Sequence, residues 1–174
     1  MSNANPKDVL EFWFGKVGEP GYLKAKSFWY GNEEDDKLVA EKLGSYYEEA
    51  KNGGLSNWAD IPDGSIALII LLDQVPRNIF RNKAQAYATD NLALSVAKKM
   101  VENGWDKNQP TVVRRYVYSP FNHSENLEDQ KRSLELFTDL GDPTHMYWAR
   151  NFYETIKKYG RFPHRDEILG RSGN

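Results

Sequence analysis

Polar residues that could do chemistry directly follow a long apolar run in the first half of the chain. Ile66 to Leu72 are all apolar, and Asp73, Gln74, Arg77 and Asn78 come next. A carboxylate and a guanidinium four residues apart can pair on a helix. The pattern indicates either an ion pair that seals a kinked, buried helix or the polar wall of a ligand site. We keep both alternatives, with Asp73, Arg77 and Asn78 as candidate binding residues.

A second polar motif consists of His123, Ser124 and Glu125, followed by Asp129 and Gln130. A histidine beside a carboxylate can act as a general acid or base, or bind a metal ion. The structural alternative is a helix start in which Ser124 is the cap and Glu125 favours the helix dipole. His123 would then be hydrogen-bonded and inert. We take His123, Ser124 and Glu125 as candidate binding residues. His123 and Glu125 are also candidate catalytic residues.

A third motif, Gly160-Arg161-Phe162-Pro163-His164-Arg165, brings cationic groups together near the end of the chain. The guanidinium fork matches the geometry of carboxylates and phosphates. Arg161, His164 and Arg165 are therefore candidate anion-binding residues, and His164 is a further candidate catalytic residue. The alternative is that these arginines pair internally with acidic residues of the first two motifs.

Composition excludes several classes of function. The net charge of -2 argues against nonspecific electrostatic binding to nucleic acid or anionic membrane. The chain has no cysteine, which excludes cysteine-ligated zinc. The absence of cysteine fits a cytoplasmic protein, and the N-terminus, MSNANPKDVLEF, lacks the features of a signal peptide. The apolar run is far shorter than the roughly 20 residues of a membrane span. No phosphate loop, dinucleotide fingerprint or nucleophile motif is present, and we predict no cofactor and no metal site.

The elements that must position these motifs are helices. Apolar residues recur at helical spacing along the chain and no segment alternates convincingly as a strand would, although Val112 and Val113 leave a strand open locally. The predicted class is all-α, a single domain over residues 1–174 that packs around the buried central helix.

Capping residues and helix breakers predict where the helices lie. Asn5 should cap the first helix, Asp63 the central helix and Asp90 a later one, and Pro76 should kink or end the central helix. The predicted helices cover 6–14, from 32 or 33 to 53, from 63 to about 75, 90–103, 110–118, from 122 or 124 to 140, and 144–159. A loop should follow from Gly160 to the end.

Five motifs in this order resemble a bacterial family known as domain of unknown function 924. They are Leu10 to Gly15 (LEFWFG), Ile66 to Arg81, Ala88 to Leu94, His123 to Gln130 and Gly160 to Arg165. The resemblance covers nearly the whole chain and implies a tetratricopeptide-like helical superhelix, with no established activity.

The polar residues of the family pattern match at the ten positions Asp73, Gln74, Arg77, Asn78, His123, Ser124, Glu125, Arg161, His164 and Arg165. This chain departs from the pattern at Val75 for phenylalanine, Asn122 for glutamate, Phe152 for histidine and Asp166 for asparagine. The change at Phe152 argues against a multi-histidine metal site.

Three functional hypotheses follow. The first is a binding domain whose polar pocket takes a small anionic molecule or a peptide carboxylate, with Arg161 and Arg165 as the clamp. The second is a hydrolase or lyase with a histidine and a carboxylate as the acid-base pair. The third is a protein-interaction module, by analogy with the fold. The sequence does not predict the oligomeric state.

Overall fold

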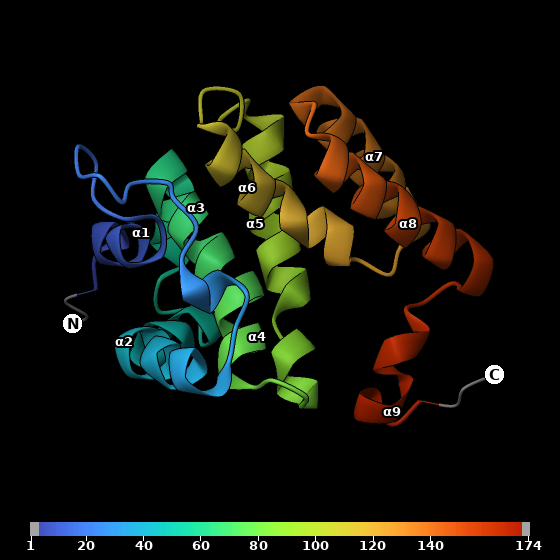
Figure 1. Cartoon of the computed structure of the whole chain (residues 1–174), viewed down its shortest axis with the longest axis horizontal. Helices are drawn as coiled ribbons and strands as arrows, with labels where there is room; N and C mark the ends of the chain where they lie inside the picture. The colour runs from blue at the N-terminus through green and yellow to red at the C-terminus, as the bar shows by residue number, and fades with distance from the viewer. Residues whose placement is uncertain (1–3, 172–174) are drawn as a thin grey trace.

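The computed structural model describes residues 4–171, and all regular structure in that range is helical (Figure 1). The all-α prediction is therefore confirmed, and the segment with Val112 and Val113 is helix. The long helices are α1 (Pro6–Phe14), α2 (Glu33–Lys51), α3 (Pro62–Ile69), α5 (Asp90–Glu102), α6 (Thr111–His123), α7 (Leu127–Leu140) and α8 (Pro143–Tyr159). The short ones are α4 (Val75–Ile79) and α9 (Asp166–Leu169). Single turns stand between them at η1 (Ser27–Trp29), η2 (Ser56–Asp60), η3 (Ile70–Gln74), η4 (Ala84–Tyr87) and η5 (Pro163–Arg165).

Helix α3 occupies the centre of the packing. It contacts α1, α5, α6 and η2, while α2 packs against α4 and η3. Helices α5, α6, α7 and α8 then pack in succession, each on the next, and α9 lies apart from the stack near the C-terminus (Figure 1). None of the helices in the described part of the chain is both long and apolar enough to cross a membrane.

The apolar run of the central helix lies in the core, as its sequence predicts. Every residue from Ile66 to Leu72 is buried, and one apolar cluster extends from Val9 to Ala149. The start of α3 also fits tightly against η2. A Cβ atom at Gly64 would lie 2.2 Å from the carbonyl oxygen of Trp58, so only glycine permits this approach.

Several predicted helix ends are confirmed. Asn5 and Asn32 cap α1 and α2 by accepting hydrogen bonds from Lys7 and Asp35. Gly141 and Gly160 end α7 and α8 in the left-handed conformation that glycine adopts without strain.

Other helix starts differ from the prediction. Ile61 and Pro62 begin α3, so Asp63 lies in its first turn and does not cap it. Thr89 occupies the cap position before α5, and Asp90 is the first helical residue. Asp90 does not cap α5, because its carboxylate binds Arg77.

The start of α7 was also predicted too early. Helix α6 continues through Pro120 to His123, and Asn126 caps α7. The predicted C-terminal loop contains η5 and α9, and its last three residues lie outside the described range.

Pro76 neither ends nor sharply breaks the central helix. The chain widens into a π turn over Ile70–Gln74 and continues as α4. Proline has no N–H group for the carbonyl one turn earlier. Thr89 donates its hydroxyl to that carbonyl of Leu72 at 2.6 Å, so the buried oxygen stays hydrogen-bonded.

Candidate functional site

A buried aspartate at the π turn orients the histidine of the second motif. Asp73 is fully buried, and its Oδ1 lies 2.8 Å from Nδ1 of His123 at the end of α6. Gln74 donates to Oδ2 of Asp73 at 2.8 Å. Burial raises the pKa of the Asp73 carboxyl, but the charges of His123 and Arg77 outweigh this effect and leave the pKa below its usual value. The ionised carboxylate fixes the imidazole ring from behind.

Arg77 connects the π turn to the start of α5. Its two terminal nitrogens bind both oxygens of Asp90 at 2.9 and 3.1 Å, and Nη1 also donates to the carbonyl of Asp73 at 2.6 Å. The carboxylate of Asp73 is farther away, at 3.6 Å. The predicted Asp73–Arg77 pair therefore exists, but Asp90 is the principal partner of the guanidinium.

Arg165 in η5 is a buried cation without a carboxylate of its own. Its exposed fraction is 6%, and its guanidinium stacks over the rings of Tyr87 and Phe162 at 4.4 and 4.7 Å. Nη2 donates to the carbonyl of His123 at 3.1 Å, whereas Nη1 lies 3.9 Å from Asp90. Within residues 4–171, Nε has no hydrogen-bond partner. Burial and the nearby charge of Arg77 lower the pKa of Arg165.

Glu125 holds the C-terminal segment, which we define as residues 160–171, against the end of α6. One carboxylate oxygen accepts the backbone N–H of Phe162 at 2.6 Å, and Arg171 binds both oxygens at 2.8 and 3.1 Å. Burial raises the pKa of Glu125, but these hydrogen bonds outweigh it and lower the pKa. Both oxygens of Glu125 are thus already hydrogen-bonded. The sequence predicted Glu125 in the first turn of the helix, but α7 begins two residues later, at Leu127.

Arg161 and His164 face other groups of the C-terminal segment. Arg161 binds Asp166 at 2.9 to 3.1 Å, and Arg171 binds the same carboxylate. His164 is exposed and packs its ring on Phe162. Burial and the charge of Arg165 lower the pKa of His164. The carboxylate that orients His123 is Asp73, so the two histidines do not share that partner.

Asn78 and Ser124 have structural hydrogen bonds. Asn78 donates to the carbonyl of Phe28 and to Asp36, on the side of α4 that faces α2. The Ser124 hydroxyl donates to Asp129 at 2.7 Å and accepts the N–H of Asn126. Ser124 therefore orders the turn before α7 without capping the helix.

A cavity of about 750 Å³, which we call the α5–α6 cavity, brings part of this set together. Of the sequence candidates, His123, Ser124, Glu125 and Arg165 line it, whereas Asp73 and Arg77 lie behind its wall and Arg161, His164 and Asn78 lie outside the lining. Polar and apolar neighbours complete the wall, among them Tyr87, Asp90, Asn91, Leu94, Ser95, Lys98, Pro120, Asn126, Asp129 and Leu169.

Sequence reasoning missed three residues of this arrangement. Tyr87, Thr89 and Asp90 lie in the turn before α5 and contact Arg165, Leu72 and Arg77, respectively. Asp90 was assigned only as a helix cap. No local pattern in the sequence marks these three residues as neighbours of the polar motifs.

Among the described residues, no three or more histidine or acidic side chains form a group that could hold a metal ion. The site combines an oriented imidazole and a buried guanidinium on one polar cavity. This arrangement can donate hydrogen bonds to an anion and can exchange a proton at the outer nitrogen of His123.

Comparison with known proteins gives a family but no activity. The profile of the family described as bacterial protein of unknown function (DUF924) matches residues 9–174. A solved structure of a protein of unknown function from Agrobacterium tumefaciens is similar, with 32% identity and a TM-score of 0.85. The similarity covers 96% of this chain and 90% of that one. No curated protein matches the chain.

Proposed function

The chain belongs to the DUF924 family of bacterial proteins of unknown function, and we propose that it binds a small anionic molecule, or the carboxylate of a peptide, in the α5–α6 cavity. Arg165 is the principal contact. The observation that carries the proposal is the incomplete pairing of this buried guanidinium.

Most cations around the cavity are paired with a carboxylate. Four cations have a close carboxylate: Arg77 with Asp90, Arg171 with Glu125, Arg161 with Asp166 and Lys98 with Asp129, all within 2.8 to 2.9 Å. Arg165 is left with a carboxylate at 3.9 Å. Because an uncompensated buried charge is costly, an anion in the cavity would supply the missing partner.

The remaining polar groups fit an anionic ligand. His123 presents its ring at the cavity wall while Asp73 holds the other side of the ring. The side-chain amides of Asn91 and Asn126 add hydrogen-bond donors. A cavity of about 750 Å³ has the size of a small-molecule site.

Arg165→Gln tests the proposal, with Arg161→Gln as the matched control. A thermal-shift screen with inorganic phosphate, sugar phosphates, amino acids and small carboxylates should identify anions that raise the unfolding midpoint, since a ligand selective for the folded state stabilises by about 2.7 kcal/mol at a hundredfold excess over Kd. The shift should disappear in Arg165→Gln and persist in Arg161→Gln, whose guanidinium is already occupied by Asp166.

A different result would assign Arg165 to the fold alone. If Arg165→Gln loses much thermal stability and the wild-type protein responds to none of the anions, the guanidinium serves only to hold the C-terminal segment. Retained binding in Arg165→Gln would place the anion elsewhere.

A second candidate function is acid-base catalysis, which the Asp73–His123 pair favours. A buried carboxylate 2.8 Å from Nδ1 fixes the tautomer and orientation of an imidazole, as in hydrolases with a histidine base. We expect turnover of a phosphate or carboxylate ester to be lost in His123→Gln, measured with a panel of such esters, while phosphate still binds. Equal turnover by His123→Gln would refute this function.

A third candidate is an interaction module with a tetratricopeptide-like arrangement. The supporting observation is the exposure of Tyr147, Trp148 and Tyr159 along α8, at the end of the helical stack. In this proposal α3 with α5, and α6 with α7, form successive helix pairs, and α8 ends the stack. Binding of a peptide that is lost in Trp148→Ala but retained in Arg165→Gln would support it. We also propose a cytoplasmic location, because the chain has no cysteine.

A further inference from the structure

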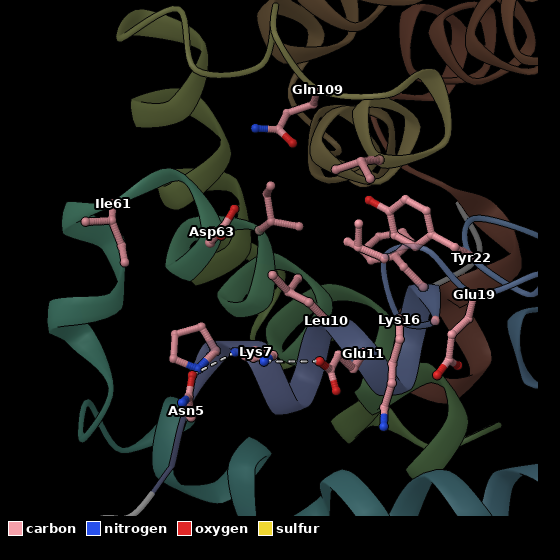
Figure 2. A pocket seen from close by; sticks show the side chains of 16 residues that line it. Asn5, Lys7, Leu10, Glu11, Lys16, Glu19, Tyr22, Ile61, Asp63 and Gln109 are labelled. Carbon is pink, nitrogen blue, oxygen red and sulfur yellow. Dashed lines mark hydrogen bonds and ion pairs between the residues drawn. The ribbon is translucent and has the colours of Figure 1, made fainter.

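A second cavity lies at the opposite end of the molecule from the C-terminal segment. Its volume is about 620 Å³, and it is enclosed by α1, the loop after α1, the start of α3 and the residue Gln109 before α6 (Figure 2). Most of its wall is apolar, formed by Leu10, Phe14, Val17, Ile61, Ile66 and Val113. We call it the α1–α3 cavity.

The rim of this cavity leaves apolar surface in water. The exposed fractions of Val17 and Ile61 are 81% and 52%, and both side chains belong to the lining. Exposure of two large aliphatic side chains on one apolar concavity is typical of a binding surface.

The loop that forms one wall is held by its own backbone. Gly15 has φ +91, and a Cβ atom there would lie 3.1 Å from the backbone of Gly21 and Tyr22. Leu23 has φ +62, and its N–H donates to the carbonyl of Phe14 at 2.7 Å. A non-glycine residue in the left-handed region is uncommon, so the loop is fixed in a specific shape over the cavity.

Three polar side chains from separate elements reach the same apolar space. Figure 2 shows Asp63 of α3, Gln109 and Tyr22 around the cavity. Within residues 4–171, the Asp63 carboxylate, the Gln109 amide and the Tyr22 hydroxyl have no hydrogen bond or ion pair with another protein group. A few convergent polar groups in an apolar wall usually orient a ligand.

The charges of the lining favour a cation. Lys7 pairs with Glu11 at 3.6 Å, which leaves Lys16, Glu19 and Asp63. Figure 2 shows Lys16 pointing away from Asp63. Outside the Lys7–Glu11 pair, the lining therefore has two carboxylates, those of Glu19 and Asp63, and one ammonium, that of Lys16. Asp63 is exposed at the start of α3.

We infer that the α1–α3 cavity binds a small molecule with an apolar body and a protonated amine. The apolar body lies against Leu10, Phe14 and Ile66, and the ammonium group donates to the carboxylate of Asp63. Gln109 and Tyr22 supply further hydrogen-bonding groups elsewhere on the cavity wall. This site is independent of the anion site in the α5–α6 cavity.

Calorimetric titration of the whole protein with hexylamine, hexanol and hexanoate tests the inference, because the three probes share one chain length and differ in charge. We expect hexylamine to bind at least about tenfold more tightly than hexanoate. Asp63→Asn should remove that preference. Asp60→Asn, a neighbouring exposed aspartate paired with Lys99, should leave it unchanged, as should Arg165→Gln.

A second variant introduces a positive charge at the rim. Ile61→Lys should weaken the binding of hexylamine and strengthen that of hexanoate, since it places a cation beside the cavity. Equal affinity of the wild-type protein for the amine and the carboxylate, or no binding of hexylamine at millimolar concentration, would overturn the inference.

Discussion

At the scale of single residues, the α5–α6 cavity depends on Asp73. This carboxylate is fully buried and contacts His123, Gln74 and Arg77. Its position behind the cavity wall means that it acts on a ligand only through His123. The net lowering of its pKa shows that the surrounding donors outweigh the effect of burial.

Asp73→Ala should be among the most destabilising single substitutions in the chain. Removing one partner of a buried charge network typically costs about 3–5 kcal/mol, because Arg77 and the His123 ring lose their shared acceptor. Urea unfolding measures the loss. Asp60→Ala, which removes an exposed carboxylate 3.6 Å from Lys99, should change the free energy of unfolding by less than about 1 kcal/mol. A similar small change in Asp73→Ala would mean that the buried network contributes little.

At the scale of helices, the π turn between α3 and α4 brings Arg77 close to the start of α5. Pro76 leaves the carbonyl of Leu72 without its helical donor, and Thr89 supplies a hydroxyl at 2.6 Å. Thr89 directly precedes Asp90, so this bond brings the start of α5 to the π turn. Asp90 can then bind Arg77. π turns frequently occur at functional sites.

Thr89→Val tests this connection with little change in side-chain volume. The Leu72 carbonyl would lose its donor in a buried environment, which costs about 1–3 kcal/mol. Urea unfolding should register this loss, and anion binding at Arg165 should weaken because Asp90 is no longer fixed. Thr138→Val on the exposed side of α7 is the control and should alter neither quantity. Unchanged stability in Thr89→Val would show that the carbonyl finds another donor.

At the scale of the whole molecule, the C-terminal segment completes the α5–α6 cavity from outside the helical stack. Glu125 binds Arg171 and the N–H of Phe162, and Arg165 binds the His123 carbonyl. The segment supplies Arg165 and Leu169 to the cavity wall. Ion pairs and hydrogen bonds to Glu125 contribute to its attachment, so the segment should respond to acid more strongly than the apolar core does.

The acid dependence of stability follows from the lowered pKa of Glu125. A carboxyl whose pKa is lower in the folded state stabilises that state above its unfolded pKa of about 4.5, and the stabilisation is lost as pH falls through the folded value. The free energy of unfolding of the wild-type protein should therefore fall below about pH 4.5 more steeply than that of Glu125→Gln. Urea unfolding at stepwise lower pH measures both slopes, and equal slopes would contradict the assigned role.

The sequence by itself determined the class of the protein and most of its helices. Helical spacing, the cap Asn5, and the glycines at 141 and 160 are local signals, because they act within one turn of the chain. The buried central run from Ile66 to Leu72 was equally clear, since a segment that is apolar on all sides has no face for water. The three polar motifs also contained every sequence candidate that the structure places on the cavity.

Only the tertiary structure decided which of those candidates meet. Asp73 and His123 are 50 residues apart, and Glu125 and Arg171 are 46 apart, so no local pattern specifies either pair. Asp90 binds Arg77 instead of capping its helix because the half-buried guanidinium of Arg77 offers its carboxylate a bidentate, charge-assisted pair. The incomplete pairing of Arg165 likewise depends on contacts between residues that are distant in the sequence.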